Sequence, residues 1–324
     1  MIKFYSRQED GRGETGSSMA ELLSTQSARY SFIWVDIEGG DRDELARVAQ
    51  EFNLDGDCIE DCLEGEQRPR IDKYDGYAFI MLYGALGPHS DTEFSPRKLA
   101  IFISARYIIT VHTEPLISIN KWRDRLMKKS NGAKDFGTDH FFYLIVDSMV
   151  DNYIVVSEAY DERLDALEER SLLHTPEPDV LAGALQLRRQ MLDLRRLASS
   201  LREALHPLVT GDLDFISDKI SIEFIHVRDH LTHTIEMVDN LRELLNGVRD
   251  NYHASLSLHA NAIMQTLTIF ASLFLPLSLI AGIYGMNTPL WPSVESPNSF
   301  WVIIGAMGVL IITMLGFYKR NKWF

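Results

Sequence analysis

IMQTLTIFASLFLPLSLIAGIYGMN, residues 263–287, contains no charged side chain between Ile263 and Tyr284. About 20 apolar residues in a helix cross the roughly 30 Å hydrocarbon core of a bilayer, so this stretch predicts a membrane span. A second uncharged run, residues 300–318, follows a short loop, residues 285–299, that is rich in Pro, Ser and Asn. The two runs predict a transmembrane helical hairpin that follows a large soluble region.

The basic residues beside the hairpin predict its orientation. Lys319, Arg320 and Lys322 follow the second span, whereas the loop 285–299 contains no Lys or Arg. Positive residues are retained on the cytoplasmic side. We therefore expect a multi-pass protein of the cytoplasmic (inner) membrane, with both termini cytoplasmic and the loop external. The first residues, MIKFYSRQED, lack the apolar core of a secretory signal.

The first span ends in the sequence Tyr-Gly-Met-Asn, residues 284–287, which is preceded by IAGI. Gly-Met-Asn at the outer end of the first of two C-terminal spans resembles the CorA family of divalent-cation channels. The segment RDHLTHTIE, residues 228–236, is similar to the family's juxtamembrane pattern. The resemblance implies a homopentamer whose five first spans surround a pore for magnesium, and for cobalt or nickel as further cargo.

Composition excludes several other classes of protein. The chain has 324 residues and a net charge of −14, which argues against nucleic acid as a partner because phosphate binding needs clustered Lys and Arg. No G-x-x-x-x-G-K-[ST] motif indicates an ATP site, and no nucleophile, base and orienting acid form a recognised catalytic motif. Cys58 and Cys62 supply only two of about four zinc ligands. We expect neither an enzyme nor an organic cofactor.

The soluble region first shows strand-like patterns and then helical ones, so we expect it to form two domains, residues 1–135 and 136–262. The transmembrane hairpin with its loop forms the third domain, residues 263–324. In the first domain the strand candidates are SFIWVDIEG (31–39), YAFIMLYGAL (77–86), RKLAIFIS (97–104) and RYIITVHT (106–113). The last two have hairpin spacing. DRDELARVAQEFN (41–53) predicts an amphipathic helix with an Asp cap. The fold class predicted for this domain is α+β, a mixed sheet with helices.

Helical periodicity dominates the second domain. Apolar residues at helical spacing predict one helix from residue 138 to the prolines at 176 and 178, and another over 179–209. From residue 213 no proline occurs before Pro276, which predicts one helix of about 70 residues that enters the membrane. Gly247 is the one residue where this helix is expected to weaken, and a break into two helices there is the alternative.

The family resemblance also implies roles for residues of the hairpin. The selectivity filter is assigned to Gly285, Met286 and Asn287. The pore-lining residues are Asn261, Met264, Leu267, Leu275, Ser278 and Gly282. From periodicity alone, this small and hydroxyl-bearing face fits helix packing as well as a pore. Leu275 and Ser278 replace the Met and Thr of better-known members. The loop lacks the family's Met-Pro-Glu-Leu, and Glu295 is its one acid.

Acidic and histidine residues of the soluble region are candidates for regulation. Asp229 matches the family's regulatory acid, whereas Thr232 stands where a second acid is usual. Asp91 and Glu93 are conceivable metal-binding partners of Asp229 across a subunit boundary. His226, His230 and His233 are spaced so that a transition metal could bridge them, although solvated or hydrogen-bonded histidines are the more common case.

Three functions compete on the sequence alone. The first is passive, channel-type transport of hydrated divalent cations, with magnesium as cargo and as a regulatory ion on the cytosolic side. The second keeps the fold but transports zinc or another transition metal. The third is a membrane-anchored sensor that conducts nothing and needs no polar stripe on the first span.

Overall fold

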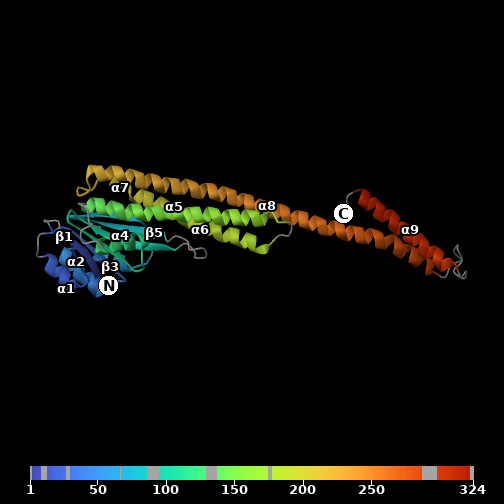
Figure 1. Cartoon of the computed structure of the whole chain (residues 1–324), viewed down its shortest axis with the longest axis horizontal. Helices are drawn as coiled ribbons and strands as arrows, with labels where there is room; N and C mark the ends of the chain where they lie inside the picture. Colours follow the sequence, from blue (N-terminus) through green and yellow to red (C-terminus); the bar gives the residue numbers. More distant parts are fainter. Residues whose placement is uncertain are drawn as a thin grey trace. The chain divides into compact units, whose positions relative to one another are not determined.

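A computed structural model describes residues 2–8, 13–26, 30–65, 67–85, 95–128, 137–173, 177–286 and 298–321. The chain forms two compact units. The first comprises residues 1–168 and 179–248, and the second comprises residues 169–178 and 249–324. Figure 1 shows the sheet and its helices in the first unit, and the terminal helices in the second.

The first unit contains a seven-stranded mixed sheet in the order β2-β1-β3-β7-β6-β5-β4. Its strands are β1 (Ile2–Gln8), β2 (Gly13–Gly16), β3 (Tyr30–Glu38), β4 (Arg70–Tyr74), β5 (Tyr77–Ala85), β6 (Pro96–Ile103) and β7 (Tyr107–His112). Only the β3–β7 pair is parallel among these pairings. The four predicted strands are confirmed as β3, β5, β6 and β7, and β6 and β7 pair as a hairpin. β1, β2 and β4 were not predicted from the sequence.

Helices cover both faces of the sheet, which explains the nearly continuous apolar runs of its central strands. On β3, Ile33, Val35 and Ile37 belong to the core formed with α1 (Met19–Gln26), α2 (Arg42–Phe52) and α3 (Gly56–Leu63). Alternate side chains of a strand point to opposite faces. Accordingly, the rings of Phe32 and Trp34 lie 5.5 and 5.0 Å from that of Phe141 on α5. Helix α4 (Ile117–Lys128) and helix α5 (Thr138–Ser171) therefore cover the other face.

The predicted amphipathic helix is confirmed as α2, with its apolar face buried in the core. Its predicted cap is wrong in one detail. Asp41 occupies the N-cap position, but its side chain makes no capping hydrogen bond. At the next helix, the Asp55 carboxylate accepts a hydrogen bond of 2.9 Å from the Asp57 N–H and does cap α3. Cys58 and Cys62 of α3 are free and buried, and burial raises the pKa of the Cys62 thiol to about 12.

A charged network is buried between β3, β7 and α4. Asp36 Oδ1 accepts a hydrogen bond of 2.8 Å from the Thr110 hydroxyl and lies 3.1 Å from His112 Nε2. Asp36 Oδ2 accepts a hydrogen bond of 3.1 Å from Arg123, which also donates to Glu38 at 2.8 Å. Asp36 and His112 are each only 2% exposed. Because a buried charge is costly without partners, this network joins α4 to the middle of the sheet.

Among the described residues, α5 is followed by the helices α6 (Pro178–Ala204), α7 (His206–Val209), α8 (Asp218–Tyr284) and α9 (Ser299–Arg320). The predicted helix 179–209 is interrupted at Leu205, because Pro207 has no N–H to continue the helical hydrogen bonds. Helix α8 is continuous for 67 residues. The alternative of a break at Gly247 is therefore wrong. Within the first unit α8 packs on α5, where the Phe224 and Phe142 rings are 5.5 Å apart.

The helical spacing of apolar residues predicted from residue 213 onward is confirmed by burial, in α8 and in Ile216 just before it. The apolar residues that recur every three or four positions are all buried in the first unit: Ile216, Ile220, Phe224, Val227, Leu231, Ile235 and Val238. The helix also forms ion pairs at its edge, where Arg195 of α6 donates a hydrogen bond of 2.7 Å to Asp239. Side-chain packing against α5 and α6 thus accounts for the part of α8 that belongs to the first unit.

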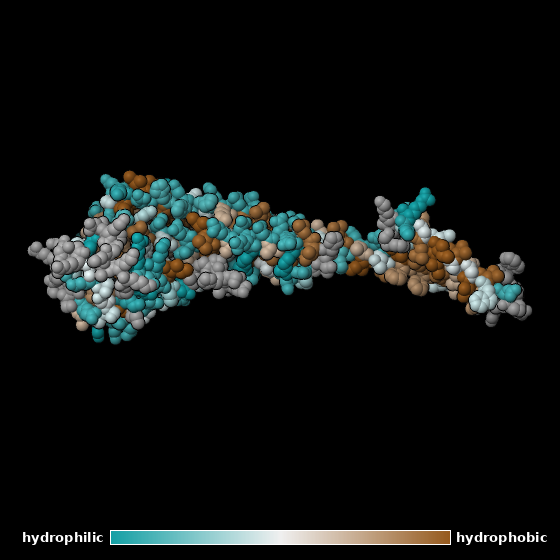
Figure 2. Space-filling view, in the orientation of Figure 1, coloured by the Kyte–Doolittle hydropathy of each residue, from teal (hydrophilic) through white to brown (hydrophobic). Residues whose placement is uncertain are grey.

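In the second unit, the C-terminal part of α8 is apolar and exposed, and so is helix α9. Each contains an 18-residue window long and apolar enough to cross a membrane, and none of either window is buried. Figure 2 shows this apolar surface. An exposed apolar surface of this extent needs a lipid or protein environment. The two helices correspond to the predicted spans, 263–284 and 300–318.

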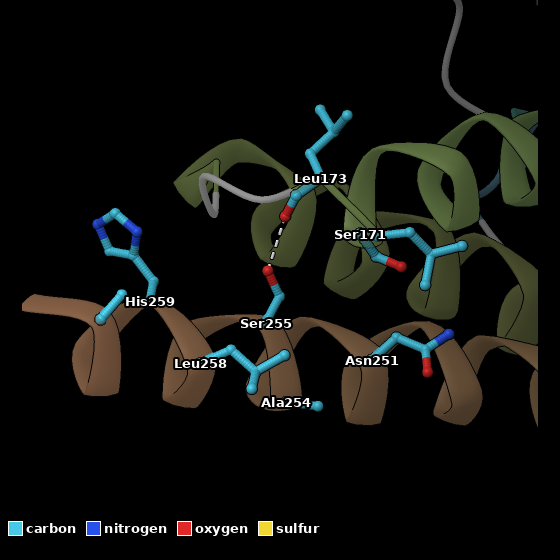
Figure 3. A pocket seen from close by; sticks show the side chains of 9 residues that line it. Ser171, Leu173, Asn251, Ala254, Ser255, Leu258 and His259 are labelled. Carbon is cyan, nitrogen blue, oxygen red and sulfur yellow. Dashed lines mark hydrogen bonds between the residues drawn. The ribbon is translucent and has the colours of Figure 1, made fainter. Parts of the chain in front are cut away.

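A pocket of about 520 Å³ lies beside α8 just before the first span (Figure 3). Leu172, Leu173 and Leu258 line its apolar part, and His259 and Asn251 are among its polar residues. The Ser255 hydroxyl donates a hydrogen bond of 2.7 Å to the Leu173 carbonyl. This bond attaches the segment after α5 to α8 within the second unit.

Candidate functional site

Two threonines of the first span have their hydroxyls satisfied within the helix. The hydroxyls of Thr266 and Thr268 donate to the carbonyls of Ala262 and Met264 at 2.9 and 2.8 Å. Hydroxyl groups bonded in this way tolerate a bilayer, where no water satisfies them. Pro276 also lies inside α8, which continues through it. The helix therefore combines an apolar span with hydroxyls available at its surface.

Helix α9 packs against one side of this span. The Ser272 hydroxyl forms a hydrogen bond with the hydroxyl of Tyr318, which is 6% exposed. The half-buried residues of α8 recur with helical spacing and form a stripe that includes Gln265, Ile269, Ser272, Pro276 and Ile280. This stripe is the side of α8 that is covered within one chain.

The residues predicted to line a pore are not part of that stripe. All six are exposed on α8: Asn261, Met264, Leu267, Leu275, Ser278 and Gly282. Leu275 and Leu267 are 70% and 67% exposed. Large apolar side chains that one chain leaves uncovered inside a membrane face either lipid or other copies of the same helix.

The predicted filter begins where α8 ends. The Gly285 N–H donates to the Ala281 carbonyl at 2.9 Å, and the Met286 N–H donates to the Ile283 carbonyl at 3.2 Å. The helix thus ends in a tightened last turn, with Gly285 and Met286 both exposed. The third filter residue, Asn287, lies outside the described residues. The same holds for Glu295 in the loop and for Asp91 and Glu93.

The regulatory candidate Asp229 is on α8 in the first unit. Its side chain is 61% exposed and lies 3.6 Å from the guanidinium of Arg228. His226 and His233 are also exposed on α8. Among the described residues, neither of them joins a group of three or more potential metal ligands.

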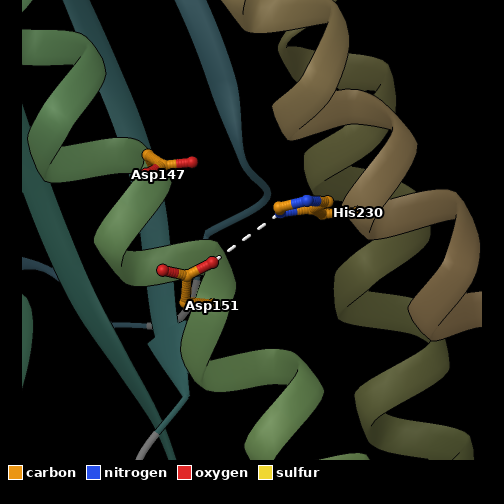
Figure 4. A group of neighbouring side chains, drawn as sticks. All are labelled: Asp147, Asp151 and His230. Carbon is orange, nitrogen blue, oxygen red and sulfur yellow. Dashed lines mark ion pairs between the residues drawn. The ribbon is translucent and has the colours of Figure 1, made fainter.

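His230 does join such a group, with two carboxylates that the sequence analysis missed (Figure 4). Asp147 and Asp151 are one turn apart on α5, and one ligand atom from each of the three residues lies within 4.8 Å of the others. Burial and the charge of Asp151 raise the pKa of Asp147, against the opposing effect of His230 and Lys121. The signal in the sequence was the pair of acids four residues apart inside the apolar run YLIVDSMVDNY.

Comparisons with known proteins identify relatives over nearly the whole chain. The family model described as "CorA-like Mg2+ transporter protein" matches residues 30–320. A putative metal ion transporter of Bacillus subtilis, YfjQ, is 32% identical over 91% of this chain and 90% of its own length. The cobalt/magnesium transport protein CorA of Thermotoga maritima is 29% identical over 90% of this chain and 83% of its own length.

Solved structures and more distant relatives extend the comparison. The structure of the CorA magnesium transporter from Methanocaldococcus jannaschii superposes with a TM-score of 0.84, at 20% identity, over 100% of this chain and 99% of that one. At this identity the likeness shows the fold. A zinc transport protein, ZntB of Yersinia pseudotuberculosis, is 23% identical over 98% of this chain and 95% of its own length.

Proposed function

Because this chain belongs to the CorA family of divalent cation transporters, we propose that it forms a homopentameric channel for hydrated magnesium in the cytoplasmic membrane. Members of this family are transporters and not enzymes. One observation carries the proposal. The first span is uncharged, leaves the face with the six predicted pore-lining residues exposed, and ends at Gly-Met-Asn. Five copies of α8 would cover that face around a central pore.

The filter chemistry suits magnesium. This ion prefers oxygen ligands in octahedral geometry and loses its water reluctantly. A ring of Asn287 side-chain carbonyls, with backbone carbonyls of Gly285 and Met286, would hold the hydrated ion through its waters. Neutral ligands bind weakly enough to release it again. Met264, Leu267 and Leu275 would form apolar rings that close the pore by excluding water.

The energetics need no ATP. Two charges that move down the membrane potential gain about 4.6 kcal/mol per 100 mV, twice the value for one charge. Both termini would lie in the cytoplasm, because Lys319, Arg320 and Lys322 follow the second span and positive residues stay on the cytoplasmic side. Cations that enter from the loop side would then move inward. Glu295 would be the one acid of the external loop that attracts cations.

A second candidate function is transport of zinc or another transition metal on the same fold. The similarity to ZntB and the presence of a histidine beside two carboxylates favour it. The test is ion flux into liposomes that contain the purified protein, measured separately with magnesium, cobalt and zinc. Magnesium flux above that of empty liposomes is expected. Flux of zinc alone would establish the second function, and no flux of any ion would leave a non-conducting sensor.

We also propose that cytosolic magnesium closes the channel by binding near Asp229, with Asp91 and Glu93 of a neighbouring subunit as further ligands. A cation between subunits neutralises carboxylates that otherwise repel and so stabilises the packed, closed arrangement. The ion shifts this equilibrium only by its higher affinity for the closed state, typically about 1–3 kcal/mol.

Asp229→Asn is expected to raise the internal magnesium concentration needed for closure by about 5- to 150-fold, the range of that coupling, without changing which ions pass. The measurement is current at graded internal magnesium. Asp250→Asn is the matched control, because Asp250 is also exposed on α8 and also lies beside an arginine, Arg249, at 3.4 Å. An inhibition curve that Asp229→Asn leaves unchanged would place the gating acids elsewhere.

A further inference from the structure

The pocket beside α8 has a wall of three leucines. Leu172 and Leu173 follow α5, and Leu258 lies on α8 (Figure 3). The pocket volume of about 520 Å³ falls within the range of sites for organic ligands, roughly 300–1,000 Å³. All the lining residues belong to the second unit, so one compact part of the chain contains the whole pocket.

The described part of the chain leaves these leucines uncovered. Leu258 is 71% exposed and Leu172 is 63% exposed. Leu173 is held beside α8, because its carbonyl accepts the hydrogen bond of 2.7 Å from the Ser255 hydroxyl. Large apolar side chains that gather around a hollow, instead of lying singly on a surface, indicate a place where an apolar partner binds.

The charges near the pocket do not favour an ionic ligand. No Asp, Glu, Lys or Arg occurs in residues 251–262 of α8 or in residues 171–176. Arg170 and Glu177, on either side of the second segment, neutralise each other, since two guanidinium nitrogens donate to Glu177 Oε2 at 3.0 and 2.7 Å. A ligand for this pocket therefore has a long apolar part.

The place of the pocket along α8 indicates which apolar molecule it meets. Leu258 precedes Ile263, where the first span begins, by five residues, which is about 7.5 Å along the helix axis. The headgroup layer on each side of the hydrocarbon core is about 5–7 Å thick. His259 and Ala262, at one end of the pocket, therefore lie in this layer, and Leu258 lies at its edge. Phospholipids are the molecules with long apolar chains in this position.

We propose that this pocket binds a phospholipid of the inner leaflet. One acyl chain contacts Leu172, Leu173 and Leu258, and the ester groups lie beside His259, whose imidazole can donate a hydrogen bond to an ester carbonyl. The bound lipid adds a second connection, beside the Ser255 hydrogen bond, between α8 and the segment after α5. The proposal rests on the membrane spans and their proposed orientation, and it does not require that the protein conducts ions.

The test uses liposomes that contain the full chain and a phospholipid with a photoactivatable diazirine in its acyl chain. Mass spectrometry after illumination identifies the residues that the lipid has labelled. Label is expected at Leu172, Leu173 and Leu258, besides the spans, which serve as the internal reference. No label is expected at Leu185, an apolar residue of α6 in the first unit that is 50% exposed.

Leu258→Ser removes part of the leucine wall at an exposed position. The label at Leu172 and Leu173 is expected to fall to the background measured at Leu185, while the label on α9 stays unchanged. Leu256→Ser is the matched control, because Leu256 is 45% exposed on the same helix and does not line the pocket. It should be labelled as the wild type is.

Two results would overturn the proposal. Without label at Leu172 and Leu173 in the wild type, the pocket would be empty or covered by a second copy of the chain. An equal loss of label in Leu256→Ser and Leu258→Ser would indicate general contact with the bilayer surface instead of a pocket. Neither readout depends on flux, so failure here would leave the proposed channel function unaffected.

Discussion

Asn287→Ala is expected to reduce magnesium flux into liposomes to the level of empty liposomes, while the protein still assembles. In the proposed channel, the substitution removes a ring of side-chain carbonyl oxygens at the pore entrance. The hydrated ion then loses the ligands that hold its waters, and its entry into the pore is no longer favourable. Because Asn287 follows α8 in the sequence and does not belong to the first unit, we expect little change in the folding of that unit.

The matched control is Asn298→Ala at the other end of the loop. Asn298 is the N-cap residue of α9, and its side chain makes no capping hydrogen bond. Its substitution should leave flux near the wild-type value. Glu295→Gln should also reduce flux less than Asn287→Ala, because one external acid attracts cations without holding them. Wild-type flux from a correctly assembled Asn287→Ala variant would disprove the filter assignment, and equal damage from Glu295→Gln would make the loop part of the ion site.

The elements predicted correctly are those whose sequence pattern has a single explanation. β3, β5, β6 and β7 are apolar on both faces because helices cover both sides of the sheet. The uncharged spans and the long periodic helix α8 are equally distinctive. Two of the three strands that were missed are of another kind. β4, with the sequence RIDKY, and β2, with four residues, form the edges of the sheet, where charged and short strands are usual. The third, β1, lies inside the sheet between β2 and β3.

The buried polar groups could not be predicted, because their partners are distant in the sequence. Asp36 was recognised as part of a strand, but its contacts with His112 and Arg123 depend on the parallel pairing of β3 with β7 and on the position of α4. In the same way, His230 meets Asp147 and Asp151 only because α8 packs on α5. Spacing within α8 indicated a cluster of His226, His230 and His233. The packing of α8 on α5 brings only His230 of these three close to the two carboxylates.

Asp36→Ala is expected to lower the free energy of unfolding of the first unit by about 3–5 kcal/mol. The substitution removes the closer acceptor of the Thr110 hydroxyl and one of the two carboxylates to which the Arg123 guanidinium donates, at a position that is only 2% exposed. It also leaves His112 Nε2 without its carboxylate, while Nδ1 lies 2.8 Å from the Glu114 carbonyl. For a unit of this size, the loss corresponds to a fall in Tm of roughly 10 °C.

The measurement is the thermal unfolding of the full chain in detergent, followed by tryptophan fluorescence, since Trp34 and Trp122 both lie on this face of the sheet. Asp36→Asn should lose less stability than Asp36→Ala, because its amide can donate to His112 Nε2 while its oxygen accepts from Arg123. Asp214→Asn, at an exposed position, should stay within about 0.5 kcal/mol of the wild type. If Asp36→Ala unfolded at the wild-type temperature, the charged network would contribute nothing to the attachment of α4, and the contacts of the Phe141 ring with Trp34 and Trp122 would be sufficient to hold that helix on the sheet.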